Sequence, residues 1–271
     1  MMLIRMNYFS KLLGNNHEII ILLPDCPFTQ EPSEYYAKKE KYKVLWLLHG
    51  TFGDSSDWLR KSLIELYAEE RNLAVVMPSA MNSNYENCPE FGFGYRMRDY
   101  FFDELMPMIY NRFPISEKRE DNYIAGLSMG GRGTLKFALG HPERFAGAAV
   151  LSQCAHDLRK LDPDKLDPRT ANDVKRAGSF EAYLNSYENT WDQLRTMLEE
   201  ETDLPDLYFA CGEADGLYQD FIEFRDYAET LGLKAKFVTE PGYAHEWRFW
   251  NEQIEKALDH FGIAKQAVGS F

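Results

Sequence analysis

The chain has 271 residues, of which 45% are hydrophobic and 27% are charged, and its formal net charge at pH 7 is −13. This length can bury a sizeable core and suffices for one large domain or two small ones. An acidic surface repels phosphate backbones and anionic lipids, so the charge argues against nucleic acids and membranes as partners.

The N-terminal stretch MMLIRMNYFSKLLGNN does not resemble a secretory signal, because Arg5, Asn7 and Lys11 interrupt its apolar residues. No apolar run reaches the roughly 18 residues that a membrane-spanning helix needs. We therefore predict a cytoplasmic protein that does not associate with membranes.

The sequence contains four cysteines, Cys26, Cys88, Cys154 and Cys211. They form no CxxC pair and no cluster with histidine at the spacing of a zinc site. We expect reduced thiols, with two disulfides in a secreted protein as the alternative.

Short apolar runs alternate with helix-like stretches along most of the chain. We expect strands at 2–10, 17–24, 44–48, 73–80, 123–125, 147–152, 206–211 and 234–240. We expect helices at 56–70, 97–113, 129–139, 217–231 and 246–261. Unbroken apolar strands that alternate with helices indicate a mostly parallel central sheet with helices on both faces. The first two strands are joined by a short turn instead, so we expect an antiparallel pair at the N-terminus.

Residues 155–204 interrupt this alternation, because they are charged and carry no strand signal. We expect a largely helical insertion within a single α/β domain that spans residues 1–271. The insertion either packs as extra helices or forms a cap over a functional site, since long insertions in such folds are often functional.

The segment YIAGLSMGGRGTLKFAL, residues 123–139, leads a strand through Gly-x-Ser-x-Gly-Gly into a helix. This is the predicted context of a nucleophile elbow, which presents a serine side chain above the carboxyl ends of the strands. Gly126, Gly130 and Gly131 supply the small residues that such a sharp turn needs. Ser128 is therefore the candidate nucleophile, and the alternative is a plain glycine turn that packs a helix onto a sheet.

Serine is a weak nucleophile at neutral pH and needs a base with an orienting acid, which follow it in this chain order in such folds. The stretch LYFACGEADGLYQD offers Glu213, Asp215 and Asp220. Asp215 lies in the turn directly after a strand, whereas Asp220 already lies in the next helix. We favour Asp215 as the acid; the alternative role for it is a helix N-cap.

Two histidines follow this aspartate. His245 lies in the loop before the last helix, from which it can reach back to Ser128, and we predict that it is the base. Its alternative role is a residue at a helix start without a catalytic task. His260 lies near the end of the last helix and is expected to pack there. His49 precedes the serine and closes a buried strand, so we interpret it as structural.

An acyl-transfer site also needs donors for the developing oxyanion. One expected donor is the backbone N–H of Met129, the residue after the nucleophile. The second is expected in the loop after LLHG, where Thr51 is favoured and Phe52 is the alternative.

The segments LLHGTFGDSSDW, VVMPSAMNSNY, GLSMGG, CGEADGLY and HEWRFW occur in this order. Together they resemble the esterase D group of α/β-hydrolases, which includes tributyrin esterases, S-formylglutathione hydrolases and feruloyl or acetylxylan esterase domains. The resemblance runs from about residue 5 to 262. It implies the α/β-hydrolase fold and serine ester hydrolysis by Ser128, Asp215 and His245. It also implies oxyanion donors at Thr51 and Met129.

The sequence departs from that group in the acid loop GEAD, in HEW where His-Asp-Trp is commoner, and in the long insertion 155–204. None of these changes affects the three candidate residues, but the insertion leaves the substrate open.

We therefore expect a serine carboxylesterase that acts on a small-molecule ester with a short acyl chain, acetyl or feruloyl esters of sugars included. It needs no metal and no organic cofactor. The alternatives are a thioesterase of the S-formylglutathione type, an acyltransferase, and a non-catalytic binding protein that keeps the fold. A homo-oligomer is left open.

Candidate substrate contacts are aromatic residues on loops near the strand tips, namely Phe52, Tyr85, Phe91 and Tyr95. Exposed loop aromatics can line an acyl or sugar-aryl pocket. The alternative is a satellite hydrophobic cluster.

Overall fold

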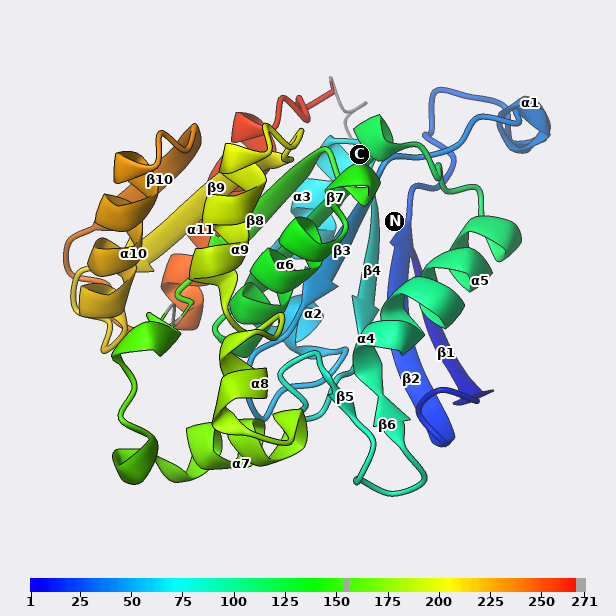
Figure 1. Cartoon of the computed structure of the whole chain (residues 1–271). Coiled ribbons are helices and arrows are strands. Elements are labelled where there is room, and N and C mark those ends of the chain that lie inside the picture. Colours follow the sequence, from blue (N-terminus) through cyan, green and yellow to red (C-terminus); the bar gives the residue numbers. More distant parts are fainter. Residues whose placement is uncertain (154–155, 267–271) are drawn as a thin grey trace.

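A computed structural model describes residues 1–153 and 156–266 of the chain. Cys154 and the first residue of the predicted insertion lie outside the described residues. The main sheet that these residues form has the strand order β1-β2-β4-β3-β7-β8-β9-β10 (Figure 1). Its strands are β1 (Met2–Ser10), β2 (Asn15–Leu23), β3 (Val44–Leu48), β4 (Ala74–Pro78), β7 (Asn122–Leu127), β8 (Gly147–Leu151), β9 (Asp206–Gly212) and β10 (Ala235–Glu240).

The sheet is antiparallel at its N-terminal edge and parallel elsewhere. Strand β2 pairs antiparallel with both β1 and β4, whereas the pairs from β4 through β3, β7, β8 and β9 to β10 are parallel. The predicted mostly parallel sheet with antiparallel N-terminal strands is therefore confirmed. The parallel part places the carboxyl ends of β3, β7, β8 and β9 along one edge of the sheet.

Both faces of the sheet are covered, which explains why its central strands are apolar without alternation. In β3, Leu45 and Leu47 face one core, whereas Val44, Trp46 and Leu48 face the other. The first core is closed by α2 (Asp57–Lys61), α3 (Ile64–Glu70) and α11 (Trp247–His260). The second is closed by α5 (Met106–Arg112), α6 (Met129–Gly140), α9 (Thr190–Glu199) and α10 (Tyr218–Thr230) (Figure 1).

Two predicted helices differ from the structure. The helix expected at 56–70 is broken into α2 and α3, because Ser62 is extended and the N–H of Leu63 donates to Asn251 of α11. The helix expected at 97–113 consists of α4 (Met97–Asp99), a π-helix (Tyr100–Leu105) and α5. Pro107 lacks a backbone N–H, which interrupts the regular hydrogen-bond ladder where the π-turn ends.

Two further elements are not predicted from the sequence, because one buries no residue and so has no apolar face, and the other has strands of only two residues. They are the helix α1 (Pro32–Ala37) and the hairpin of β5 (Asn87–Cys88) and β6 (Tyr95–Arg96).

The insertion is helical, as predicted. It contains two short 3₁₀ turns (Leu158–Lys160 and Pro163–Lys165), then α7 (Pro168–Ala177), α8 (Phe180–Leu184) and α9. Figure 1 shows α7 and α8 beyond the carboxyl ends of the strands, whereas α9 lies beside α6 on the face of the sheet. The insertion thus both adds to the core and approaches the edge that carries the candidate site. In the part of the chain described, no helix is long and apolar enough to cross a membrane.

Candidate active site

Ser128 lies between β7 and α6 in a strained backbone conformation. Its φ of 54° and ψ of −116° lie outside the regions that ordinary residues prefer, at a cost of about 1–3 kcal/mol. Its N–H donates to the carbonyl of Leu151 on β8 at 2.8 Å, which anchors the turn to the neighbouring strand. This backbone conformation places the serine side chain beyond the carboxyl end of β7.

Glycines make this turn sterically feasible. A Cβ atom at Gly126 would lie 2.4 Å from the carbonyl oxygen of Gly130, and one at Gly130 would lie 2.5 Å from that of Leu48. Side chains at these positions would push α6 away from β3 and β7. The Gly-x-Ser-x-Gly pattern therefore has a packing cause in this chain.

The structure brings Ser128, His245 and Asp215 together in one hydrogen-bonded chain. The Oγ of Ser128 lies 3.0 Å from Nε2 of His245, and Nδ1 of His245 lies 2.8 Å from Oδ2 of Asp215. A carboxylate can only accept, so Nδ1 carries the proton and Nε2 is free to accept the serine proton. This is the arrangement in which an imidazole activates a hydroxyl.

Asp215 is held in its charged form by hydrogen bonds inside the protein. Its side chain is 0% exposed and lies in the turn after β9. Burial raises its pKa, but the hydrogen bond from His245 and the N–H of Leu217, at 2.9 Å from Oδ1, outweigh this and lower the pKa below its ordinary value. A buried carboxylate of this kind can orient an imidazole and stabilise its protonated form.

A second set of contacts fixes the His245 ring. The ring lies nearly perpendicular to that of Trp250, with 4.9 Å between the centroids, and Nε1 of Trp250 donates to Oγ of Ser152 at 3.0 Å. Ser152 is buried with a φ of 47°, and its hydroxyl also lowers the pKa of Asp215. Ser152 is not predicted from the sequence, where its only signal is its position directly after β8.

His49 and His260 have structural partners. His49 is 1% exposed; its Nδ1 donates to the Gly50 carbonyl at 2.7 Å, and its Nε2 accepts from the N–H of Ala80 at 2.8 Å. Burial lowers the pKa of His49, so the ring stays neutral. His260 pairs with Asp206 at 3.0 Å. Both histidines therefore lie where the sequence predicted, outside the candidate site.

The two candidate oxyanion donors line one cavity of about 210 Å³. Thr51, Phe52 and Met129 all contribute to its wall. Phe52 has a φ of 65°, and its N–H donates to Oδ1 of Asn82 at 2.8 Å. The N–H of Thr51 has no acceptor among the described residues. This favours Thr51 over Phe52 as a donor to a ligand.

The four candidate aromatic contacts lie in different places. Phe52 is 84% exposed at the wall of the small cavity, and Phe91 and Tyr95 line a neighbouring cavity of about 560 Å³. Tyr85 is 0% exposed, and its hydroxyl donates to the His49 carbonyl at 3.0 Å. Tyr85 packs in the core beside Gly133 of α6. The prediction that Tyr85 contacts the substrate is therefore wrong.

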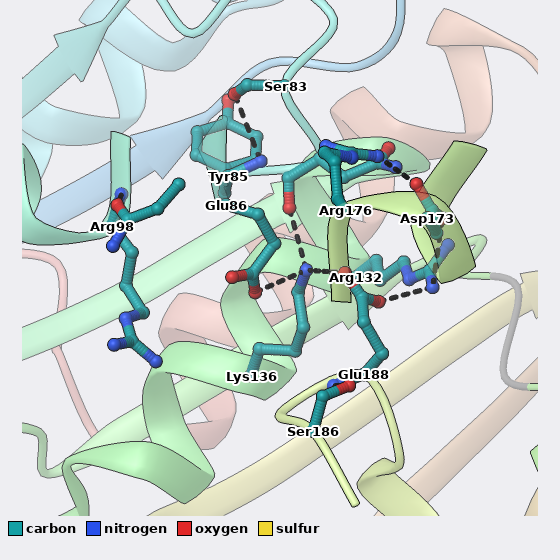
Figure 2. Close-up of polar contacts among 12 residues, drawn as sticks. Ser83, Tyr85, Glu86, Arg98, Arg132, Lys136, Asp173, Arg176, Ser186 and Glu188 are labelled. Atoms are coloured by element: carbon teal, nitrogen blue, oxygen red, sulfur yellow. Dashed lines mark hydrogen bonds and ion pairs between the residues drawn. The ribbon is translucent and has the colours of Figure 1, made fainter. Parts of the chain in front are cut away.

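A buried ion network joins α6 to the insertion (Figure 2). The side chain of Lys136 is 1% exposed, and its Nζ contacts Glu188 at 3.0 Å, Glu86 at 2.8 Å and the Asn84 carbonyl at 2.8 Å. Arg132, one turn earlier on α6, pairs with the same Glu188. Burial raises the pKa of Glu188, but the two cations lower it overall, so Glu188 is charged.

Asp173 of α7 extends this network to the small cavity. It lies 3.9 Å from Arg132 and pairs closely with Arg176, and both Asp173 and Arg176 line the cavity that contains Thr51 and Met129 (Figure 2). Ion pairs thus connect α6, which begins directly after Ser128, to the wall of the small cavity.

The described residues contain no group of three or more His, Cys, Asp or Glu side chains placed to hold a metal ion. Cys26, Cys88 and Cys211 are free thiols.

Comparisons with known proteins show the family of the chain. The sequence model of a family described as "Putative esterase" matches residues 12–261. An acetyl esterase of Caldicellulosiruptor saccharolyticus is 29% identical over 269 residues, which cover 96% of this chain and 97% of that protein.

Two solved structures from Staphylococcus aureus are each 30% identical. One is an S-formylglutathione hydrolase, with a TM-score of 0.80 over 97% of this chain and 99% of that chain. The other is the fluorophosphonate-binding serine hydrolase F, with a TM-score of 0.78 over 97% and 98%. The α/β-hydrolase fold predicted from the sequence is confirmed by this similarity.

Proposed function

The chain belongs to this esterase family and is an ester hydrolase, and we propose that it is a serine carboxylesterase for short-chain acyl esters. In this proposal Ser128 is the nucleophile, His245 the general base and Asp215 its orienting acid. The observation that carries it is the chain of hydrogen bonds from Ser128 through His245 to a buried carboxylate, at the tip of a strained turn.

The proposed reaction proceeds through an acyl-enzyme. Nε2 of His245 takes the proton of Ser128 as Oγ attacks the ester carbonyl, and the N–H groups of Thr51 and Met129 stabilise the oxyanion. The imidazolium then donates its proton to the leaving alcohol oxygen, and the C–O bond breaks. Water repeats these steps on the acyl-enzyme, with His245 again as base, and releases the carboxylic acid.

A short acyl chain is supported by the small cavity beside Met129, of about 210 Å³, and by the similarity to an acetyl esterase. A second candidate function is supported by a specific similarity. Hydrolysis of a thioester of the S-formylglutathione type would proceed through the same kind of acyl-enzyme, and the S-formylglutathione hydrolase of Staphylococcus aureus is 30% identical to this chain.

The test is turnover of 4-nitrophenyl acetate and butyrate by the wild type and Ser128→Ala, with folding of both checked by circular dichroism. We expect kcat/KM to fall by about 10³-fold or more in the variant, because removal of the nucleophile leaves only binding and the oxyanion donors. A fluorophosphonate probe should label the wild type and not the variant. Equal turnover by the two proteins would refute the proposal.

A further inference from the structure

The cavity beside the candidate oxyanion donors lies next to a larger one. The small cavity, of about 210 Å³, and the large cavity, of about 560 Å³, share Asn82, Asn172 and Arg176 in their walls. Ligand sites for small organic molecules commonly have volumes in this combined range. A substrate bound at Ser128 can therefore extend from the small cavity into the large one.

One part of the wall of the large cavity is apolar. Met81, Phe91 and Tyr95 line the large cavity, and Met81 and Phe91 are 50% and 55% exposed as whole residues. Exposed apolar side chains gathered around a hollow beside a reactive group are typical of a binding site. This side offers contact to the apolar body of a substrate.

A second part of the wall is formed by one face of α7 and is polar. Arg169, Asn172, Asp173 and Arg176 recur at intervals of three, one and three residues, which places them on the same side of the helix, and all four line the small cavity. Lys175 lines the large cavity. The insertion thus contributes a row of polar and charged groups to the site.

The charges on this wall do not cancel. Asp173 is paired with Arg176 and lies 3.9 Å from Arg132, so its charge is neutralised (Figure 2). Arg169 and Lys175 are exposed and form no ion pair within residues 1–153 and 156–266, against a single unpaired carboxylate, Glu90, on the large cavity. This local excess of positive charge contrasts with the net charge of −13 of the whole chain.

From these observations we infer that the substrate of this esterase carries an anionic group, such as a carboxylate, beside an apolar body. Arg169 and Lys175 bind the anionic group, and the apolar wall at Met81 and Phe91 receives the body. The guanidinium of Arg169 matches the geometry of a carboxylate, and a cleft with charges of one sign concentrates ligands of the other. This inference rests on the proposed function, because it concerns the substrate of the same site.

The anionic group can lie on either side of the ester bond, and two substrate pairs separate these cases. For the leaving-group side, 4-acetoxybenzoate is compared with neutral 4-acetoxybenzamide. For the acyl side, 4-nitrophenyl hemisuccinate is compared with 4-nitrophenyl butyrate. The measured quantity is the ratio of kcat/KM for the anionic member to that for the neutral member, in the wild type and in variants.

We expect this ratio to fall about fivefold in Arg169→Gln and in Lys175→Gln, and by more in the double variant, for at least one substrate pair. The ratio should also fall as the salt concentration rises, because salt screens exposed charges. The matched control is Lys234→Gln, which removes an exposed positive charge just before β10, at the opposite edge of the sheet, and should leave the ratio unchanged.

Two failures are distinguishable. If the neutral esters are hydrolysed through Ser128 but neither ratio changes in the α7 variants, the inference is overturned and the proposed function stands. If Ser128→Ala hydrolyses the neutral esters as fast as the wild type, the proposed function itself is wrong.

Discussion

The carboxylate of Asp215 is placed to orient a histidine and not to take up a proton. One oxygen accepts from His245 and the other from the backbone N–H of Leu217, so both are engaged by donors. These donors keep its pKa below the ordinary value although the side chain is fully buried. Glu213 lies in the same turn but is exposed, so it cannot replace this function.

Asp215→Asn is therefore expected to reduce kcat strongly while the fold is kept. An amide can donate to Nδ1 of His245 and then favours the tautomer with the proton on Nε2, which cannot accept from Ser128. A fall in kcat of about 10⁴-fold is typical of this change in a Ser-His-Asp site. The measurement is kcat for 4-nitrophenyl acetate, with the melting temperature as a check on folding.

Glu213→Gln is the matched control, since it removes a carboxylate that lies two residues before Asp215 in the same turn. It should retain turnover close to that of the wild type. If Glu213→Gln lost as much activity as Asp215→Asn, the assignment of the acid would be wrong.

The candidate residues of the site could be predicted from the sequence because each lies in a local context with a physical meaning. Ser128 lies between glycines at a strand end, and Asp215 and His245 follow strands in the order that this fold uses. Ser152 and Asn82 could not be predicted, because their roles depend on side chains from distant segments. The prediction for Tyr85 is wrong for the same reason, because this side chain is buried by its packing against α6, which the local sequence does not show.

Among the elements, α6 links the candidate nucleophile to the insertion. Arg132 and Lys136 are four residues apart and therefore lie on one side of the helix, where both meet Glu188. Lys136 also holds Glu86 in the segment before β5. A buried cation that serves two carboxylates cannot be removed without leaving charge uncompensated.

Lys136→Met is therefore expected to lower the free energy of unfolding by about 3 kcal/mol, because Glu86 and Glu188 lose a buried partner. Urea denaturation measures this change. Lys165→Met is the control, because Lys165 forms an exposed pair with Asp162 in the insertion, and such pairs contribute at most about 1 kcal/mol. Equal losses in the two variants would show that the network contributes no more than a surface pair.

The long apolar strands and the amphipathic helices were predictable because burial on both faces leaves a clear pattern in the sequence. The break between α2 and α3 was not, since it depends on Asn251 from the far end of the chain. The strands β5 and β6 have two residues each and are too short to show a period. The elements that differ from the prediction therefore either depend on a contact with a distant segment or are too short to leave a pattern in the sequence.

At the scale of the whole molecule, buried histidines make stability depend on pH. His17 on β2 is 5% exposed and packs its ring against Tyr100. Burial lowers its pKa from 6.5 to about 4, only partly offset by a backbone hydrogen bond with Ser79. Below pH 6.5 the unfolded chain therefore binds a proton at His17 that the folded protein does not bind until about pH 4.

The unfolded state binds more protons in this window, so stability must fall as the pH is lowered from 6.5 to 4. For a shift of this size the loss from His17 is about 3 kcal/mol. Lowered pKa values at His49 add to the loss in the same direction. The wild type should accordingly unfold at lower urea concentrations at pH 4.5 than at pH 7.

His17→Gln tests this argument, because it removes the titrating ring and keeps a polar side chain. Urea denaturation of both proteins between pH 4 and 7 should show a smaller loss of stability in the variant, whatever its stability at pH 7. The comparison uses the slope of stability against pH, so a general destabilisation by the substitution does not affect it. Identical slopes would mean that His17 is protonated in the folded protein at its ordinary pKa, which its burial beside Tyr100 argues against.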